Sequence, residues 1–159
     1  NHPAWEYPVS NPQRYMDIQG MTGIAHLDAF FVHDTSDTQF IYPSSSSGSY
    51  YGFVANDNST STQTTNNYGS PALEVNGDNK SFSNRDDIEG HLTGRKLVYH
   101  RSATTTNWPT FTMSQYASTA DSNWNLKNTK FSEWIWYDSD QHSNQSGIES
   151  NINTHYNIY

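Results

Sequence analysis

The sequence contains no cysteine, which excludes disulfide bonds, thiolate zinc sites and cysteine nucleophiles. Cationic side chains are few, with 8 Lys and Arg against 16 Asp and Glu, and the net charge is −8. Because no cluster of Lys or Arg occurs, the sequence predicts no nucleic-acid partner and no docking on an anionic membrane. No apolar run approaches the roughly 20 residues that span a bilayer, so no membrane insertion is predicted.

Aliphatic side chains are also scarce, since hydrophobic residues fill only 33% of the 159 positions while aromatic residues alone reach 14%. One domain of this length can bury a core, but that core must rely on Tyr, Trp and Phe. Charged residues are sparse at 15%, so Ser, Thr and Asn must keep the chain soluble. This mixture favours strands and turns over helices.

The first 22 residues differ from the rest of the chain. Their opening, NHPAWEYPVSNPQ, contains three prolines, which favours an extended arm or edge segment over residues 1–22. No signal-peptide pattern is present at the start. Because the first residue is Asn1, we expect either processing or a longer polypeptide upstream. Residues 23–159 are predicted to form one β-sandwich domain.

Alternating apolar segments predict the strands of this domain. In IAHLDAFFVHD, residues 24–34, Phe30 and Val32 share one face and Ala29 and Phe31 the other, which is typical of an inner strand. Residues 38–42 follow a turn-like DTSD and are predicted to form a hairpin with the strand that precedes this turn. Further strands are predicted at residues 49–55, 91–102, 110–118 and 131–138, with a tight hairpin at Asn76-Gly77.

The chain closes on a predicted strand and a predicted helix. In the strand, Phe131, Glu133, Ile135 and Tyr137 are expected on one face, and Trp134 and Trp136 on the other. The helix is indicated by an apolar stripe at i, i+4, i+8 and i+11, formed by Ile148, Ile152, Tyr156 and Tyr159. Ser146 and Glu149 have the spacing of an N-cap and its capping-box partner. We expect this closing segment to hold the fold together.

Loops rich in Asn, Ser and Thr separate the strands, and the longest, residues 56–70, is either a plain surface loop or a binding loop. Aromatic rings beside amide and carboxylate groups favour sugar binding, because rings stack on sugar C–H faces and the polar groups bind hydroxyls. The alternative is that these rings close the sandwich ends or are buried against a neighbouring chain. The candidate ligand-binding residues are Tyr50, Tyr51, Asp57, Asn58, Tyr68, Trp108, Tyr116 and Trp124.

Metal and catalytic chemistry find less support. The seven histidines form no HxH or HExxH pair, and His26 and His33, seven apart, would point to opposite faces of a strand. Two oxygen-rich segments, residues 34–37 and 56–58, are candidate calcium-binding sites, although ordinary turns explain both. Glu133, flanked by aromatic residues inside a predicted strand, is the one candidate acid, whereas acid–base hydrolysis of sugars needs two carboxylates. No catalytic residue is therefore predicted.

The closing segment, FSEWIWYDSDQHSNQSGIESNINTHYNIY, resembles the end of concanavalin A-like, laminin-G-type jelly-roll domains of phage structural proteins and bacterial surface proteins. In that family a strand F-x-E-x-I-x-Y precedes a polar turn and a helix with the pattern IE-x-x-I-x-x-x-Y. The upstream order of segments is also similar, although Trp134 and Trp136 replace residues that are more often aliphatic. The matching residues are Phe131, Glu133, Ile135, Tyr137, Ile148, Glu149, Ile152 and Tyr156.

The resemblance implies an all-β, antiparallel two-sheet jelly roll with a short C-terminal helix, used for recognition or adhesion. We therefore expect a non-enzymatic module that binds a surface glycan outside the cell, on a virion or a cell surface. One alternative is a structural assembly protein, such as a decoration, spike or filament subunit that contacts other copies of itself or neighbouring subunits. A polysaccharide-degrading enzyme is the third hypothesis.

Overall fold

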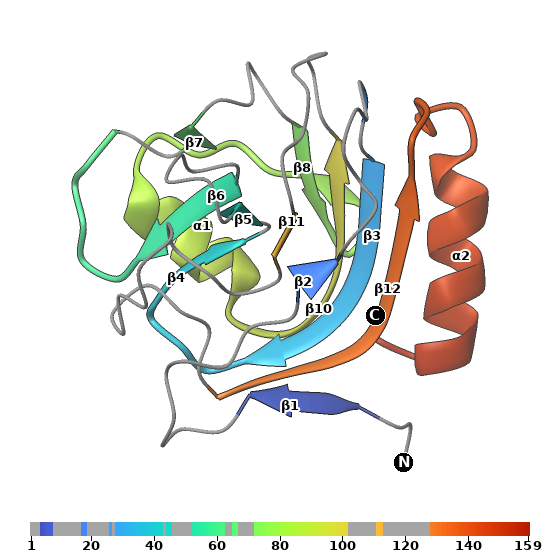
Figure 1. Ribbon diagram of the computed structural model, residues 1–159, viewed down its shortest axis with the longest axis horizontal. Helices are drawn as coiled ribbons and strands as arrows, with labels where there is room; N and C mark the ends of the chain where they lie inside the picture. The colour runs from blue at the N-terminus through green and yellow to red at the C-terminus, as the bar shows by residue number, and fades with distance from the viewer. Residues whose placement is uncertain are drawn as a thin grey trace.

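The computed structural model describes residues 4–7, 17–18, 26, 28–42, 44–45, 52–62, 65–66, 72–101, 111–112 and 128–159. Within these ranges the chain forms twelve β-strands and two α-helices (Figure 1). All strand pairings between the described residues are antiparallel, and one of the helices is C-terminal. The prediction of a mainly β, antiparallel fold with a C-terminal helix is confirmed.

The largest sheet has six strands, and β3 lies inside it. Along its full length β3 pairs with β10 on one side and with β12 on the other, as an inner strand should. The strands in spatial order are β1 (Trp5–Tyr7), β12 (Thr129–Tyr137), β3 (Asp28–Thr35), β10 (Gly94–Arg101), β8 (Ala72–Val75) and β9 (Asp78–Asn79).

The predicted hairpin between β3 and the strand after it is wrong. Both edges of β3 are occupied by long strands, so β4 (Gln39–Tyr42) pairs instead with β6 (Gly52–Asn56). At the exit of β3, the backbone N–H of Ser36 donates to the carbonyl of Asn128, which ties the departing chain to β12 rather than to a hairpin. Sequence reasoning missed this because pairing partners distant in the chain leave no local signal.

Two smaller sheets complete the strand set. In one, β6 also pairs with β7 (Thr65–Asn66), so its order is β4-β6-β7. The other has the order β2-β11-β5, formed by β2 (Asp17–Ile18), β11 (Phe111–Thr112) and β5 (Ser44–Ser45). The strand predicted at residues 110–118 is therefore described only at β11, and the rest of it lies outside the described residues.

Helix α1 (Arg85–Leu92) was not predicted, because its acidic opening RDDIE is equally typical of a turn. The Asn84 side chain accepts from the backbone N–H of Asp87, and the Asp87 carboxylate accepts from the backbone N–H of Asn84. This reciprocal capping box satisfies donors at the start of the helix, and the Asp at its third position also suits the helix dipole. Ile88 and Leu92 are buried against the six-stranded sheet.

The core lies on both faces of that sheet. On one face Phe31 packs in a cluster with Leu73, Val98 and the buried side chains of α1. On the other, Phe30 stacks on Tyr99 with ring centroids 4.3 Å apart. The alternation of Phe30 and Phe31 between two apolar layers confirms the predicted faces of this strand.

A β-bulge at Ser132 changes which side chains of β12 share a face of the sheet. Phe131 pairs with His33 and Glu133 with the next residue of β3, so one residue of β12 is extra. The bulge moves Phe131 to the α1 face, where its ring centroid lies 4.9 Å from that of Trp134. Its predicted place on the Glu133, Ile135 and Tyr137 face is therefore wrong, because the bulge breaks the period of two.

Helix α2 (Gln145–Tyr156) covers the opposite face of the sheet from α1 (Figure 1). Its buried stripe contains Ile152 and Tyr156, as predicted, but Tyr159 follows the helix and is 53% exposed. The helix begins two residues earlier than predicted, with Asn144 as N-cap and no side-chain capping bond. Ser146 is therefore not the N-cap, and Glu149 is buried instead of capping the helix.

The predicted Asn76-Gly77 hairpin is confirmed between β8 and β9. Both residues have positive φ, 56° and 80°, which the Asn-Gly pair adopts at low cost. The Asn76 side chain also accepts from the backbone N–H of Leu97, and its own N–H donates to the Leu97 carbonyl. The turn is thereby fixed to the middle strand β10.

Candidate functional site

Most of the predicted sugar-binding residues lie outside the described part of the chain, and their prediction stays untested. Only Asp57 and Asn58 are described, in the turn that follows β6. The residues outside the described ranges are Tyr50, Tyr51, Tyr68, Trp108, Tyr116 and Trp124.

Asp57 lies in an exposed acidic group with Asp86 and Glu89 of α1. The backbone N–H of Asn58, a residue with φ of 58°, donates to the Asp86 carboxylate at 2.7 Å. Hard carboxylate oxygens of this kind suit calcium, so part of the predicted 56–58 segment does meet further acids. Sequence reasoning missed Asp86 and Glu89 because they are about thirty positions away.

The other predicted calcium segment, residues 34–37, gathers no such group among the described residues. Asp34 lies beside Ser36, Asn128 and Lys130 in a shallow hollow, and the Asp37 N–H donates to the Thr35 hydroxyl. That bond is an ordinary Ser/Thr turn, which is the alternative that the sequence left open.

A second group, His26, Asp28 and Asp140, gathers at the start of β3. Asp28 is fully buried and accepts from His26 Nε2 at 2.9 Å, the Tyr99 hydroxyl at 2.8 Å and the Gln141 N–H at 2.7 Å. Burial, and then the bond to Asp28, raises the pKa of Tyr99, so its hydroxyl stays a donor. Asp28 thus joins three segments of the fold.

Asp140 is saturated in the same way, although it is exposed. It accepts from the His142 N–H at 2.8 Å and from Arg101 Nη2 at 2.9 Å, and these bonds lower the pKa of its carboxyl. Because protein donors already hold both carboxylates, the contacts of Asp28 and Asp140 are those of a network that ties the end of β12 to β3 and β10.

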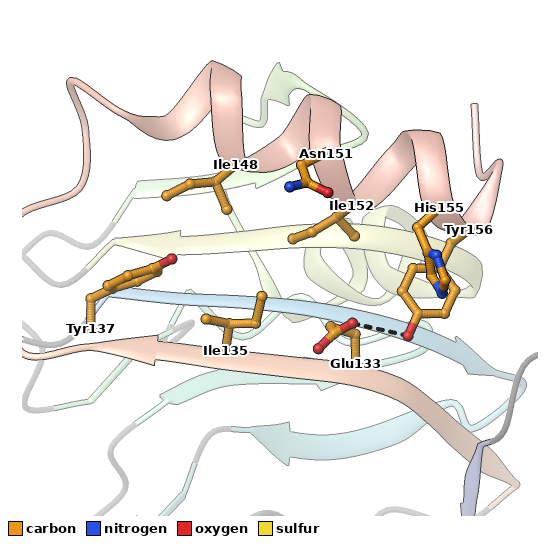
Figure 2. Close-up of a pocket in the computed structure, with 8 residues that line it drawn as sticks. All are labelled: Glu133, Ile135, Tyr137, Ile148, Asn151, Ile152, His155 and Tyr156. Carbon is orange, nitrogen blue, oxygen red and sulfur yellow. Dashed lines mark hydrogen bonds between the residues drawn. The ribbon is translucent and has the colours of Figure 1, made fainter.

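A groove between α2 and β12 combines aromatic, apolar and polar side chains and has a volume of about 330 Å³. Figure 2 shows Ile148, Asn151 and Ile152 pointing down from the helix, while residues of β12 point up toward it. We call it the α2–β12 groove, and it is lined by Glu133, Ile135, Tyr137, Ile148, Asn151, Ile152, His155 and Tyr156.

One end of the α2–β12 groove is held by Tyr156. Its hydroxyl lies 2.9 Å from both the Glu133 carboxylate and the Ser132 carbonyl, the backbone group at the bulge. Burial, and then the bond to Glu133, raises the pKa of Tyr156. The His155 ring stands edge-on to the Tyr156 ring with centroids 4.7 Å apart. This end therefore presents fixed polar atoms beside an aromatic ring.

The middle and the other end of the groove are apolar with two available polar groups. Ile152 belongs to the buried cluster on this face, and the half-buried Ile135 and Ile148 pack against that cluster. The Tyr137 ring stands perpendicular to Phe30 with centroids 6.0 Å apart, so its position is fixed by packing. Within the described residues, the Tyr137 hydroxyl and the Asn151 amide make no hydrogen bond, and Figure 2 shows both beside the groove.

The sequence predicts that the closing strand and helix hold the fold together and that loops elsewhere in the chain bind the ligand. Helix α2 does close the fold, yet its Asn151 and His155 lie at i+3 and i+7 from Ile148, on the same side as the apolar stripe. Polar residues at these positions were the available signal. They border the buried stripe instead of lying opposite it, so they line the groove.

None of the protein-family models, curated proteins or solved structures compared with the chain matches it. The resemblance to laminin-G-type domains therefore stays a prediction. Among the described residues, neither helix is long and apolar enough to cross a membrane.

Proposed function

We propose that the protein is a non-enzymatic glycan-recognition module of a virion or cell-surface structural protein, and that the α2–β12 groove is one of its sugar-binding sites. The observation that carries this proposal is the groove's combination of rings, apolar surface and unengaged polar groups. A sugar ring needs an apolar contact for its C–H face and directional partners for its hydroxyls. Tyr137, Ile135 and Asn151 offer these together.

A binding role is favoured over catalysis by the number of carboxylates. Glu133 is the one acid among the eight residues that line the groove. Hydrolysis of a glycosidic bond commonly uses a pair of carboxyl groups on either side of the bond. Glu133 already accepts a hydrogen bond from Tyr156, which suits a group that orients a hydroxyl.

The finer fold assignment, a two-sheet jelly roll, belongs to the same proposal. Its support is that β3 has apolar residues on both faces and that Ala55 of β6 is buried in the cluster on the α1 face. Strands of one sheet then contribute to the core of another, as in a sandwich. The pattern of the closing segment adds the resemblance to laminin-G-type domains.

The test is glycan-array screening of the intact chain, followed by calorimetric titration of the strongest-binding oligosaccharide. We expect Tyr137→Phe and Asn151→Ala each to weaken binding about 10-fold, which is the worth of roughly 1.4 kcal/mol for one polar contact. Ser150→Ala changes an exposed neighbour on the same helix and serves as the matched control, with Kd unchanged within two-fold.

Two outcomes would count against the proposal in different ways. If the chain binds no glycan, the proposed function is wrong. If binding is unchanged by both groove substitutions, the groove is not the binding site. In that case Trp108→Ala and Trp124→Ala test whether the predicted loop residues bind the sugar instead.

A second candidate function is assembly with other copies or neighbouring subunits. Its specific support is the outer edge of β12, since β1 pairs only with residues 129–131 of that strand. Among the described residues, 132–137 have a strand partner on the β3 side alone. An unpaired strand edge is a template for pairing with another chain.

A further inference from the structure

Two buried glutamates meet between α2 and the sheet. Glu74 of β8 and Glu149 of α2 are 3% and 4% exposed, respectively. The Nε2 atom of Gln145 donates to both carboxylates, to Oε2 of Glu74 and to Oε2 of Glu149, the latter at 3.2 Å. One amide group thus bridges two acids that are 75 positions apart in the chain.

Among the described residues, the charge of this pair has no cationic partner. In the part of the chain that the structure describes, neither Glu74 nor Glu149 forms an ion pair. Glu149 Oε1 is buried and makes no hydrogen bond within that same part. Burial is the main cause that raises the pKa of Glu149, the Gln145 bond opposes it, and the Glu74 charge raises it further.

The phenol of Tyr159 also interacts with the charge of Glu149. Burial is the main cause that raises the pKa of Tyr159, and the charges of Glu149 and Asp78 raise it further. Burying unpaired carboxylates is costly, so two adjacent ones need either a shared proton or a bound cation. A buried carboxylate oxygen that makes no hydrogen bond within the described residues, in a side chain held beside a second buried carboxylate, fits the ligand set of a cation.

We propose that Glu74, Gln145 and Glu149 form a calcium-binding site that fastens the start of α2 to β8. All three side chains supply hard oxygen ligands, because rotating the Gln145 amide by half a turn presents Oε1 to the ion. Calcium accepts irregular oxygen sets and fills its remaining positions with water, whereas magnesium demands near-octahedral geometry.

This site differs from the exposed acids at Asp57, Asp86 and Glu89. Asp57 and Asp86 are exposed, so their charge is screened, and Glu89 is half-buried; within the described residues none of the three carries a buried atom that lacks a partner. The Glu74–Glu149 pair instead joins two elements, so ion binding there adds directly to the stability of α2 on the sheet. The inference does not depend on the glycan proposal.

The experiment is calcium titration of the intact, chelator-treated chain at pH 7, followed by thermal unfolding and calorimetry. We expect a Kd on the order of 10⁻⁴ to 10⁻³ M. At calcium ten times above Kd, Tm should rise by about 3 °C. Glu149→Gln and Glu74→Gln should each abolish this rise. Asp86→Asn, the matched control, should keep it.

The pH dependence distinguishes a cation from a shared proton. Because burial raises the pKa of Glu149, lowering the pH to 4.5 should weaken the calcium response of the unchanged chain. If calcium has no effect at pH 7, the proposal is overturned. It is also overturned if Asp86→Asn abolishes the response, or if Glu149→Gln and Glu74→Gln both keep it.

Discussion

At the scale of single residues, His33 and His100 are buried in the neutral form within the six-stranded sheet. His33 Nε2 donates to the Leu92 carbonyl at 2.7 Å, which fixes the tautomer because a carbonyl only accepts. Burial is the main cause that lowers the pKa of His33 from 6.5 to about 4 and that of His100 to about 3. His33 is therefore held inside the sheet by a backbone carbonyl, which is a structural role.

This burial predicts a loss of stability in mild acid. The unfolded chain binds a proton at each histidine near pH 6.5, whereas folded His33 stays neutral until about pH 4. Above pH 6.5 the histidine is neutral in both states, so its contribution to the free energy of unfolding is at its maximum. As the pH falls from 6.5 to 4, the free energy of unfolding decreases by about 3 kcal/mol. Urea unfolding of the unchanged chain at pH 7 and pH 4.5 should show this loss.

His33→Gln is the variant that isolates the effect, because its amide keeps a donor for the Leu92 carbonyl but does not titrate in this range. We expect it to lose less stability than the unchanged chain between the two pH values. His142→Gln, at an exposed turn, should behave like the unchanged chain. Identical pH slopes for His33→Gln and the unchanged chain would show that this histidine does not titrate as inferred.

At the scale of elements, the two helices begin in different ways. Helix α1 has a reciprocal capping box between Asn84 and Asp87, and the Ser83 N–H also donates to Asp87. Helix α2 has Asn144 as N-cap without a side-chain capping bond. It relies on packing instead, with Ile152 buried and with Arg95 Nη2 donating to the Tyr156 carbonyl at its last turn. The N-cap asparagine therefore stabilises the start of α1 more than it stabilises the start of α2.

The capping difference can be measured with one substitution made at two places. Asn84→Ala removes a bond to the N–H of Asp87 and should lower the free energy of unfolding by about 1 kcal/mol. Asn144→Ala removes only an exposed contact with Gln141 and should change it by less than about 0.5 kcal/mol. Guanidinium unfolding gives both values, and equal losses would contradict this account of the caps.

At the scale of the whole molecule, the six-stranded sheet is covered on both faces but keeps an open edge at β12 among the described residues. The bulge at Ser132 interrupts that edge, and the net charge of −8 repels other copies. Both features oppose edge-to-edge pairing. They favour the recognition proposal over the assembly alternative.

We therefore expect the intact chain to sediment as a monomer at micromolar concentration and neutral pH. Analytical ultracentrifugation at low and at 0.5 M salt measures this and shows whether screening the charge promotes association. A stable trimer or polymer at either salt concentration would favour the assembly function. In that case residues 132–137 of β12 are the first surface to examine.

The sequence by itself determined the local elements of this protein. Alternation defined β3 and β12, Asn76-Gly77 defined a hairpin, and the spacing of Ile148, Ile152 and Tyr156 defined a helix. These features depend on side-chain direction along one segment, which has a fixed period in a strand or a helix. For the same reason they could be predicted without knowing any partner segment.

Only the tertiary structure decided which segments pair with these elements and which side chains contact one another. It paired β4 with β6, placed Phe131 on the other face through a bulge, and formed the α2–β12 groove. It also brought Glu149 beside Glu74, where sequence spacing had suggested a helix cap. Such contacts join residues far apart in the chain, and their energies come from burial and charge that exist only after the elements have packed.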